Sequence, residues 1–407
     1  MKNMKRNYFT EDNQTDKALI NIEAGVIEEY SAVLVPKNCP EALAVGDKFS
    51  EEIRSSMVAD FEKSGDQMCH VSTFVYAKGN IYMSYYANTD TGAEDPNFQV
   101  ARLAYCPEND TSKMTYLDIQ KVGDKVSGNI IDRVYDTILM RWDEDTLFVL
   151  WTASANNKYY RFYRIFNMET GELSETYVNR FKVGDTVNDF STTGIQNALT
   201  ANGIGYKTMF SDIGIMQKLS YRMENGEKWY YSGAYSGDFN CIIKSKDLMT
   251  WEYVSQPDFI NQSKWENAVY VLNDKVYYFV RQHDPHFDED GKLKDGSVYG
   301  FLTYYDLKTG KWETPVLVED CQSRSDFIVY DGNLYLFHAP INREHIGLLK
   351  IDTDDLSKTE IVFAADMKGS CFYPFIDYNS KGELSMSYTV SRRHIRLADF
   401  TLSKYIK

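Results

Sequence analysis

Short runs of alternating apolar and polar residues recur along the chain, and these runs are rich in aromatic and β-branched side chains. Six times such a run is followed by a pair of turn-forming residues and then by a second run of the same kind. The turn pairs are Gly79-Asn80, Glu144-Asp145, Asn225-Gly226, Asn273-Asp274, Asp331-Gly332 and Lys381-Gly382. Alternation with a period of two predicts β-strands, and pairs such as Asn-Gly or Asp-Gly between two strands predict hairpins. The chain is therefore predicted to contain six copies of one hairpin unit.

Weaker strand patterns lie between the hairpins, and the turn pairs are separated by roughly 48 to 81 residues, which suits four-stranded blades. We predict an all-β fold, a single six-bladed β-propeller; a pair of β-sandwiches is the alternative. Residues 1–64 are expected to form an N-terminal extension with a closing strand, and residues 65–407 the propeller that carries catalysis. Helical spacing is confined to the segment Phe49–Lys63.

Composition narrows the classes of partner. Of the 407 residues, 43% are apolar and 25% charged, and the formal net charge is -15. Nucleic acids and anionic membranes both require a basic surface, so neither is an expected partner. No apolar stretch approaches the length of about 18 residues that a membrane span requires.

The predicted compartment rests on the N-terminus and on the cysteines. The basic start of the chain is not followed by an apolar run, so it does not have the pattern of a secretory signal; a trimmed secreted chain would look the same. The six cysteines show neither a C-x-x-C pair nor a zinc-binding spacing. We expect reduced, mostly buried thiols in a cytoplasmic protein.

A propeller brings one end of each inner hairpin to a central pocket. The start of the first strand and the end of the second strand lie there in every blade, and in this sequence both positions are polar or aromatic. The residues at these positions are His70, Asp136, Asp212, Glu266, Arg324 and Tyr373 at strand starts, and Trp151, Tyr235, Arg281 and His338 at strand ends. A pocket lined by carboxylates, arginines and aromatic rings is typical of a sugar-binding site. Alternatively, Trp151 packs in the core, and Asp136 and Asp212 bond to backbone amides.

Five of the blades, namely the first and the third to the sixth, resemble the sialidase superfamily of exo-glycosidases. The fourth copy has Glu266 at its strand start and Arg281 fifteen residues later, and the sixth has Tyr373 early in its first strand. The fifth copy has a hairpin followed by Pro and then Arg343. In the family these positions hold a general base, two arginines that bind the substrate carboxylate, and a catalytic tyrosine. A weaker likeness is Ser245–Trp251, which resembles an Asp box with Met249 at the usual Gly position.

The first blade departs from the family pattern. Sialidases place there an arginine that completes a carboxylate-binding triad, and this sequence has His70 instead. Histidine does not supply the planar two-pronged hydrogen bonding of arginine. Either Arg324, Arg133 or Arg141 takes its place from a neighbouring position, or the substrate is another ulosonic acid or no acid. The acid/base aspartate of the family lies about 25 residues further on, and Asp95 stands at that distance.

The resemblance implies a retaining hydrolase with a tyrosine nucleophile. A carboxylate nucleophile would be repelled by a substrate carboxylate, whereas a neutral phenol is not, and sialidases are an exception to the two-carboxylate rule. Tyr373 would lose its proton to Glu266, Asp95 would act as acid and base, and Arg281 and Arg343 would hold the acidic sugar. We expect no cofactor and no metal, since the histidines lack a ligand spacing.

Three other functions remain open. In a carboxylate-pair glycosidase, Asp136 or Asp212 would act together with Glu266 on an arabinoside, xyloside or galactoside. A polysaccharide lyase would use Tyr, His and Arg side chains, and a non-catalytic propeller would only bind carbohydrate. In every case the expected partner is a carbohydrate, and the oligomeric state is left open.

Overall fold

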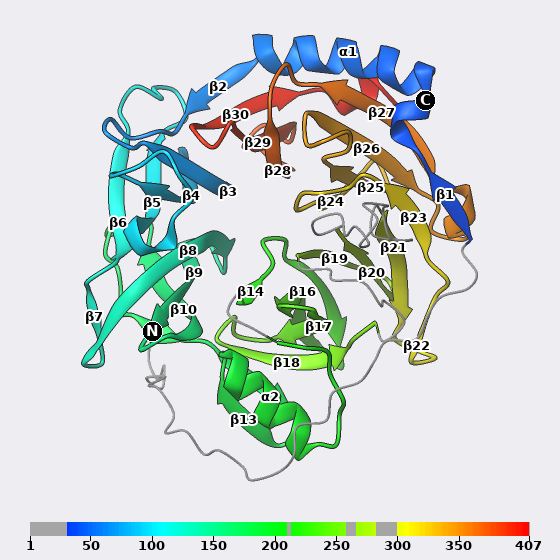
Figure 1. Ribbon diagram of the computed structural model, residues 1–407. Coiled ribbons are helices and arrows are strands. Elements are labelled where there is room, and N and C mark those ends of the chain that lie inside the picture. Colours follow the sequence, from blue (N-terminus) through cyan, green and yellow to red (C-terminus); the bar gives the residue numbers. More distant parts are fainter. Residues whose placement is uncertain (1–30, 210–212, 258–265, 282–298, 407) are drawn as a thin grey trace, which may run out of the picture.

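Six β-sheets surround a central axis as the blades of a propeller (Figure 1). The computed structural model describes residues 31–209, 213–257, 266–281 and 299–406. The predicted six-bladed, all-β propeller is therefore confirmed, and a pair of β-sandwiches is excluded. Asp212, one of the expected site residues, lies outside the described residues.

The first two sheets come from the N-terminal half of the propeller. From the axis outward, the first sheet contains β3 (Met68–Ala77), β4 (Asn80–Asn88), β5 (Gln99–Pro107) and β6 (Thr115–Lys121). The second contains β8 (Asn129–Arg141), β9 (Thr146–Ala155), β10 (Lys158–Asn167) and β11 (Tyr177–Val178), and β7 (Lys125–Val126) pairs with the start of β8.

The third and fourth sheets have extra strands. The inner edge of the third is shared by β14 (Ile213–Ile215) and β15 (Ser220–Glu224), followed by β16 (Glu227–Ser236), β17 (Phe239–Ser245), β18 (Thr250–Ser255), β12 (Arg180–Val183) and β13 (Thr186–Asp189). The fourth contains β19 (Asn267–Leu272), β20 (Lys275–Val280), β21 (Tyr299–Asp306), β23 (Val316–Glu319) and β1 (Ala32–Leu34), with β22 (Lys311–Trp312) on β21.

The last two sheets have four strands each. The fifth contains β24 (Asp326–Tyr330), β25 (Asn333–His338), β26 (His345–Ile351) and β27 (Glu360–Asp366). The sixth contains β28 (Cys371–Tyr378), β29 (Leu384–Val390), β30 (His394–Phe400) and β2 (Met57–Asp60). Because β2 comes from the N-terminal segment, the sixth sheet joins the two ends of the propeller chain.

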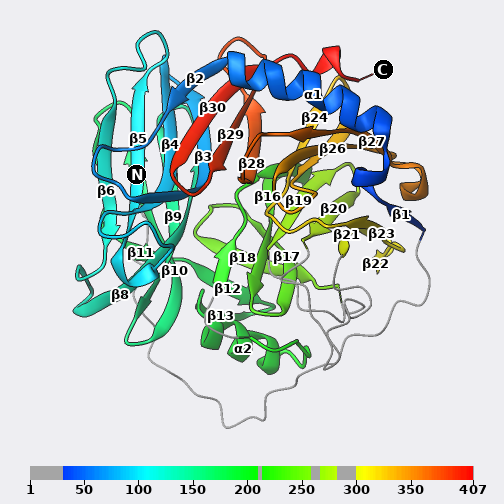
Figure 2. The same cartoon turned by 45° about the horizontal axis from the view of Figure 1, so that its top comes forward.

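The described part of the N-terminal segment packs on the propeller. Strand β1 extends the fourth sheet in parallel with β23, and β2 lies antiparallel to β30. Between them, helix α1 (Pro40–Ser55) lies across β27 and β30 (Figure 2). The helix begins and ends earlier than the predicted Phe49–Lys63, because Pro40 suits a first helical turn and the chain already pairs as a strand from Met57.

A second helix, α2 (Thr192–Ala201), was not predicted. It begins at Ser191, whose side chain accepts a hydrogen bond from the Gly194 amide, an N-terminal cap that satisfies an otherwise unpaired donor. The helix packs against β12 and β13 at the outer edge of the third sheet. Its ten residues are too few for a clear period of 3.6, which is why the pattern did not indicate it.

The Asp-box-like residues form a turn between β17 and β18. The carboxylate of Asp247 accepts hydrogen bonds from the amides of Met249 and Thr250 at 2.8 Å each, and Leu248 takes a left-handed backbone conformation with φ of 58°. Trp251 is completely buried behind this turn. These residues therefore have a structural role here.

Three inner strands share an irregularity close to their start. In β3, β8 and β28 the register against the next strand shifts after His70, Tyr135 and Phe372. The residue that follows has a positive φ in each case, namely Val71, Asp136 and Tyr373. A bulge of this kind bends the strand and redirects a side chain, so Asp136 and Tyr373 occupy equivalent positions of their blades at the axis.

Apolar side chains fill the spaces between neighbouring blades. One cluster, for example, joins Ala101 and Leu103 of the first sheet to Val149 and Phe162 of the second. Burial of such surface is the main favourable term in folding, and it leaves the polar residues at the axis enclosed by a rigid ring. None of the helices in the described ranges is both long and apolar enough to cross a membrane.

Candidate active site

Glu266, Tyr373 and Arg281 meet at the axis. The Tyr373 hydroxyl donates a hydrogen bond to Oε2 of Glu266 at 2.8 Å. Nη1 of Arg281 lies 2.6 Å from the same carboxylate oxygen and 3.0 Å from the Tyr373 hydroxyl. All three are less than a tenth exposed. The fourth and sixth blades thus supply a phenol, a carboxylate and a guanidinium in mutual contact.

The charges around this trio fix its protonation state. Burial alone raises the pKa of Glu266, but Arg324 and Arg281 outweigh it and lower the pKa to about 2. Burial, and then the Glu266 charge, raise the pKa of Tyr373 to about 12. A neutral phenol therefore faces an ionised carboxylate over the whole range around neutrality, which is the arrangement of a nucleophile and its base.

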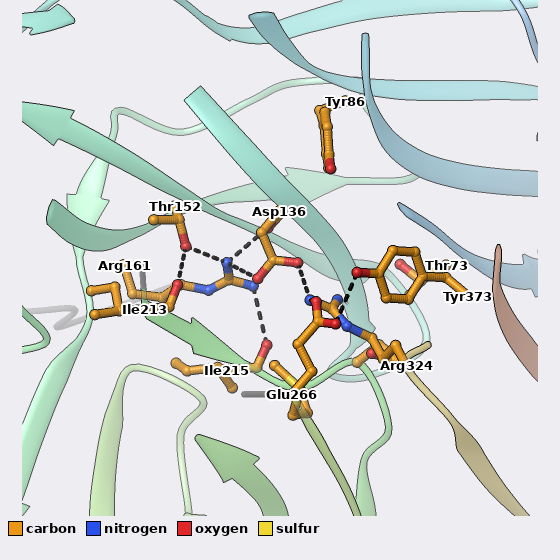
Figure 3. A network of polar contacts seen from close by, with 12 residues as sticks. Thr73, Tyr86, Asp136, Thr152, Arg161, Ile213, Ile215, Glu266, Arg324 and Tyr373 are labelled. Atoms are coloured by element: carbon orange, nitrogen blue, oxygen red, sulfur yellow. Dashed lines mark hydrogen bonds and ion pairs between the residues drawn. The ribbon is translucent and has the colours of Figure 1, made fainter. Parts of the chain in front are cut away.

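A chain of alternating charges continues from Glu266 into the second blade (Figure 3). Nη2 of Arg324 lies 2.7 Å from Oε1 of Glu266 and 2.7 Å from Oδ1 of Asp136. The other Asp136 oxygen is 2.9 Å from Nη1 of Arg161. Arg161 is completely buried and also donates to Thr152 and to the backbone carbonyl of Ile215. Asp136 is thus held by two arginines, and its carboxylate accepts no hydrogen bond from a backbone amide of the described residues.

His70 packs directly against the candidate nucleophile. Its ring centroid is 4.5 Å from that of Tyr373, and Nδ1 lies 3.1 Å from the hydroxyl of Thr389. Complete burial, followed by the nearby arginine charges, lowers the pKa of His70 well below its ordinary value. The histidine is therefore neutral, and it does not replace the positive charge of an arginine.

Arg343 reaches the site from a strained turn. Ile341, Asn342 and Arg343 have φ values of 54°, 55° and 61°, a left-handed conformation that costs roughly 1–2 kcal/mol per residue. The Arg343 guanidinium carbon lies 4.5 Å from the ring centroid of Phe372 and 5.7 Å from that of Tyr373. Its Nε and Nη2 atoms are buried without a hydrogen-bond partner among the described residues.

Sequence reasoning missed Arg392. Its guanidinium carbon is 4.9 Å from the Phe372 ring centroid, so it shares this ring with Arg343. Its Nε lies 2.8 Å from Oε2 of Glu94, and Oε1 of Glu94 accepts a hydrogen bond from Tyr86. The only sequence signal was the Arg-Arg pair after the last hairpin, and the tertiary structure alone shows which arginine faces inward.

Asp95 lies in the same loop as Glu94, but its side chain forms hydrogen bonds within that loop. Its Oδ1 accepts hydrogen bonds from the backbone amide and the side-chain amide of Asn97, at 3.0 and 2.7 Å. It thereby caps the short helix η2 (Pro96–Phe98). The residue is half-buried and makes no described contact with Tyr373 or Glu266.

Two expected site residues lie elsewhere. Trp151 is completely buried and stacks on Phe162 at 5.9 Å, in the apolar cluster between the first and second blades. His338 is completely buried with Nδ1 3.0 Å from the thiol of Cys321. These positions correspond to the core-packing alternative, because inward-facing and buried residues alternate along a strand and both can be aromatic.

Tyr235 does lie at the axis. It is buried, and its ring packs so closely on Gly214 that a Cβ atom there would be 2.4 Å from the ring and 3.0 Å from Asp136. A glycine at position 214 therefore allows the third blade to approach the charged chain.

The described side chains around Tyr373 carry an excess of positive charge. Five arginines, namely Arg161, Arg281, Arg324, Arg343 and Arg392, face three carboxylates, those of Asp136, Glu266 and Glu94. Arg161, Arg324 and Arg281 share the charges of Asp136 and Glu266, and Arg392 pairs with Glu94. Arg343 lies beside the phenol ring, and its Nε and Nη2 atoms have no hydrogen-bond partner among the described residues.

Only one group of described residues has the geometry of a metal site. Asp60, Glu62 and His394 lie within 4.8 Å of one another, but they sit at the outer edge of the sixth sheet, where His394 already bonds to both carboxylates. This group is not part of the site at the axis.

No family model and no curated protein matches this chain. Among solved structures, the Hadza microbial sialidase Hz136 matches with a TM-score of 0.56 and 11% identity, over 84% of this chain and 67% of that one. The chain has the fold of the sialidase propellers. A structure of the sialidase NanB with Optactamide matches with a TM-score of 0.51 and 9% identity, over 86% of this chain and 72% of that one. NanB is a sialidase from Streptococcus pneumoniae.

The resemblance to sialidases predicted from five of the blades is thus confirmed at the level of the fold. A GH43 enzyme from Xanthomonas citri matches with a TM-score of 0.42 and 8% identity, over 86% and 92% of the two chains. That likeness is too distant to bear on the blade count or on the site.

We expect Asp136→Asn to lower the free energy of unfolding by about 3–5 kcal/mol, because it leaves Arg161 and Arg324 buried beside a neutral amide. Thermal or urea unfolding measures the loss. Asp143→Asn is the matched control, since Asp143 is exposed at the end of the same blade, and it should change stability by less than about 0.5 kcal/mol. Equal stability of the two variants would contradict the importance of the charged chain.

Proposed function

We propose that the chain is an exo-acting, retaining glycoside hydrolase that releases a terminal acidic sugar of the ulosonic type from a glycan. The observation that carries this proposal is the 2.8 Å hydrogen bond from the Tyr373 hydroxyl to the Glu266 carboxylate. A phenol is a weak nucleophile unless a base takes its proton, and the buried, ionised Glu266 is placed to do so.

In the first step, the Tyr373 oxygen attacks the anomeric carbon while its proton passes to Glu266. The bond to the leaving oxygen breaks, and an acid in the loop 89–95 protonates that oxygen. In the second step the same loop residue takes a proton from water, and the resulting hydroxide attacks the anomeric carbon. The bond between that carbon and the Tyr373 oxygen breaks, and Glu266 returns its proton to the departing phenolate.

Asp95 remains the proposed acid and base. Glu94 is closer to the site, but both of its oxygens are engaged, one by Tyr86 and the other by Arg392. Within the described part of the chain, the Asp95 carboxylate bonds only to Asn97 of its own turn, and catalytic contacts often form only when substrate is bound.

The acidic substrate is supported by the arginines. Arg281 and Arg343 lie on the phenol side of Glu266, and Arg392 shares the Phe372 ring with Arg343. Charge-assisted hydrogen bonds from guanidinium to carboxylate are stronger than neutral ones. We infer that Arg392, from the sixth blade, supplies the third positive charge, since the position expected to hold it carries a neutral His70.

A carboxylate pair of Asp136 and Glu266 is disfavoured. One guanidinium nitrogen of Arg324 is 2.7 Å from an oxygen of each, so the arginine fills the space between them. An inverting pair stands about 6.5–9.5 Å apart with room for a water molecule. Asp212 lies outside the described residues and is not tested.

Tyr373→Phe should lower kcat by at least about a hundredfold, because the nucleophile is removed while the fold is kept. Turnover is measured on aryl glycosides of sialic acid, its deaminated relative and Kdo, beside arabinoside, xyloside, fucoside and rhamnoside. Tyr378→Phe is the control on the same strand, as Tyr378 is exposed. Hydrolysis of a neutral glycoside that survives Tyr373→Phe would overturn the proposal, and no hydrolysis in the panel would favour a lyase or a binding propeller.

The acid can be identified from the leaving group. Asp95→Asn should slow the hydrolysis of glycosides with alkyl leaving groups far more than that of nitrophenyl glycosides, because nitrophenolate departs without protonation. Glu94→Gln should slow both to a similar degree. If the leaving-group dependence follows Glu94 instead, the acid role belongs to that residue.

Arg392→Ala should raise KM for an acidic glycoside by about tenfold to a hundredfold, the equivalent of one charged hydrogen bond. Arg393→Ala is the matched control, since Arg393 adjoins it in the same turn and is exposed, bonding to the Gln67 carbonyl. Equal KM values for the two variants would show that Arg392 does not bind the substrate.

A further inference from the structure

A second cavity opens on the opposite face of the propeller. Inner strands begin on the face that holds Tyr373 and end on the other one, and the cavity lies at those ends. It has a volume of about 410 Å³ and is lined among others by Trp142, Gln217, Lys218, Lys228, Tyr230 and Asp377. This volume is within the range of about 300–1,000 Å³ that is usual for ligand sites. We call it the far-face cavity.

Buried polar groups separate this cavity from the candidate active site. Tyr373 and Asp377 belong to the same strand, β28, so a rise of about 3.3 Å per residue sets them roughly 13 Å apart. Between the two ends lies Asp326, completely buried and 3.1 Å from Nζ of Lys218. The far-face cavity is thus a separate site with its own floor.

The floor is built by an interruption of the third blade. Strands β14 and β15 both pair with β16, but residues 216–219 between them leave the sheet edge. This break presents Gln217 and Lys218, which are only 5% and 6% exposed. Oε1 of Gln217 has no hydrogen-bond partner among the described residues. An unpaired buried amide oxygen is costly, and a ligand hydroxyl in the cavity would satisfy it.

The walls are aromatic. Trp142 is half-buried, and its ring centroid lies 5.6 Å from that of Tyr230. Nζ of Lys228 is 4.6 Å from the Tyr230 ring and 4.0 Å from the ring of Tyr221, which is 57% exposed. The aromatic surface therefore continues from the cavity onto the outer face of the molecule.

The charges of the lining balance. Arg141, Lys218 and Lys228 are offset by the three carboxylates of Asp143, Glu144 and Asp377, whereas the candidate active site has an excess of arginine. A neutral ligand therefore fits here better than an acidic one. Aromatic walls suit the C–H face of a pyranose ring, and the charged and amide groups suit its rim of hydroxyls.

We propose that the far-face cavity binds neutral sugar residues of a glycan, independently of the chemistry at Tyr373. The catalytic face would process the acidic end group, and the far face would hold a neutral part of the same or of a neighbouring glycan. The proposal does not depend on the proposed hydrolase function.

The test uses the full chain with Tyr373→Phe, so that turnover cannot consume a ligand. Isothermal titration with lactose, cellotriose and xylotriose is compared with titration with free sialic acid. We expect at least one neutral saccharide to bind, and Trp142→Ala to weaken its binding at least tenfold. Trp229→Ala is the matched control. Trp229 precedes Tyr230 on β16 and faces the other side of the sheet, against Lys244 and Lys246. The Trp229→Ala variant should bind the saccharide as tightly as the Tyr373→Phe chain from which it is made.

Lys228→Gln provides a second variant in case Trp142→Ala fails to fold, and it should weaken the same saccharide severalfold. Three results would overturn the proposal: no binding of any neutral saccharide, binding that neither cavity variant weakens, or binding of sialic acid that depends on Trp142. Because activity is measured separately in the parent chain, a failure here is distinguishable from a failure of the proposed hydrolase.

Discussion

Arg324 is the residue on which the centre of this propeller depends. Its guanidinium lies between the carboxylates of Glu266 and Asp136, and it allows an ionised Glu266 to exist where burial would otherwise neutralise it. Isolated buried charges are very unfavourable, so the alternating order of charges from Arg281 to Arg161 is needed for any of them to remain ionised. The neutral phenol of Tyr373 then meets a base that is already charged.

Some of the strained backbone positions lie around the same centre. Asp136 and Tyr373 lie in equivalent bulges of the second and sixth blades, and residues 341–343 form a left-handed turn that includes Arg343. Each of these conformations is unfavourable by itself and persists because rigid surrounding sheets fix it. At the two bulges, the strained residues contribute a carboxylate and a phenol to the charged chain at the axis.

One set of inner strands serves two faces of different character. On β28, Tyr373 belongs to the arginine-rich end and Asp377 to the charge-balanced end. The buried pair of Lys218 and Asp326 lies between these ends and closes the axis. The two ends of these strands therefore differ in charge, with an excess of arginine at one and balanced charges at the other.

The sequence by itself determined the blades and part of the site. A period of two and a turn pair are local features, so they predicted six hairpins, and strand starts predicted Glu266, Arg324 and Tyr373 at the axis. The short helix α2 and the partners of each charge were decided only by the tertiary structure. Three features depend on contacts between residues that lie far apart in the chain. They are the packing of Trp151 in a core, the inward position of Arg392 in place of Arg393, and the sharing of Arg324 by Asp136 and Glu266.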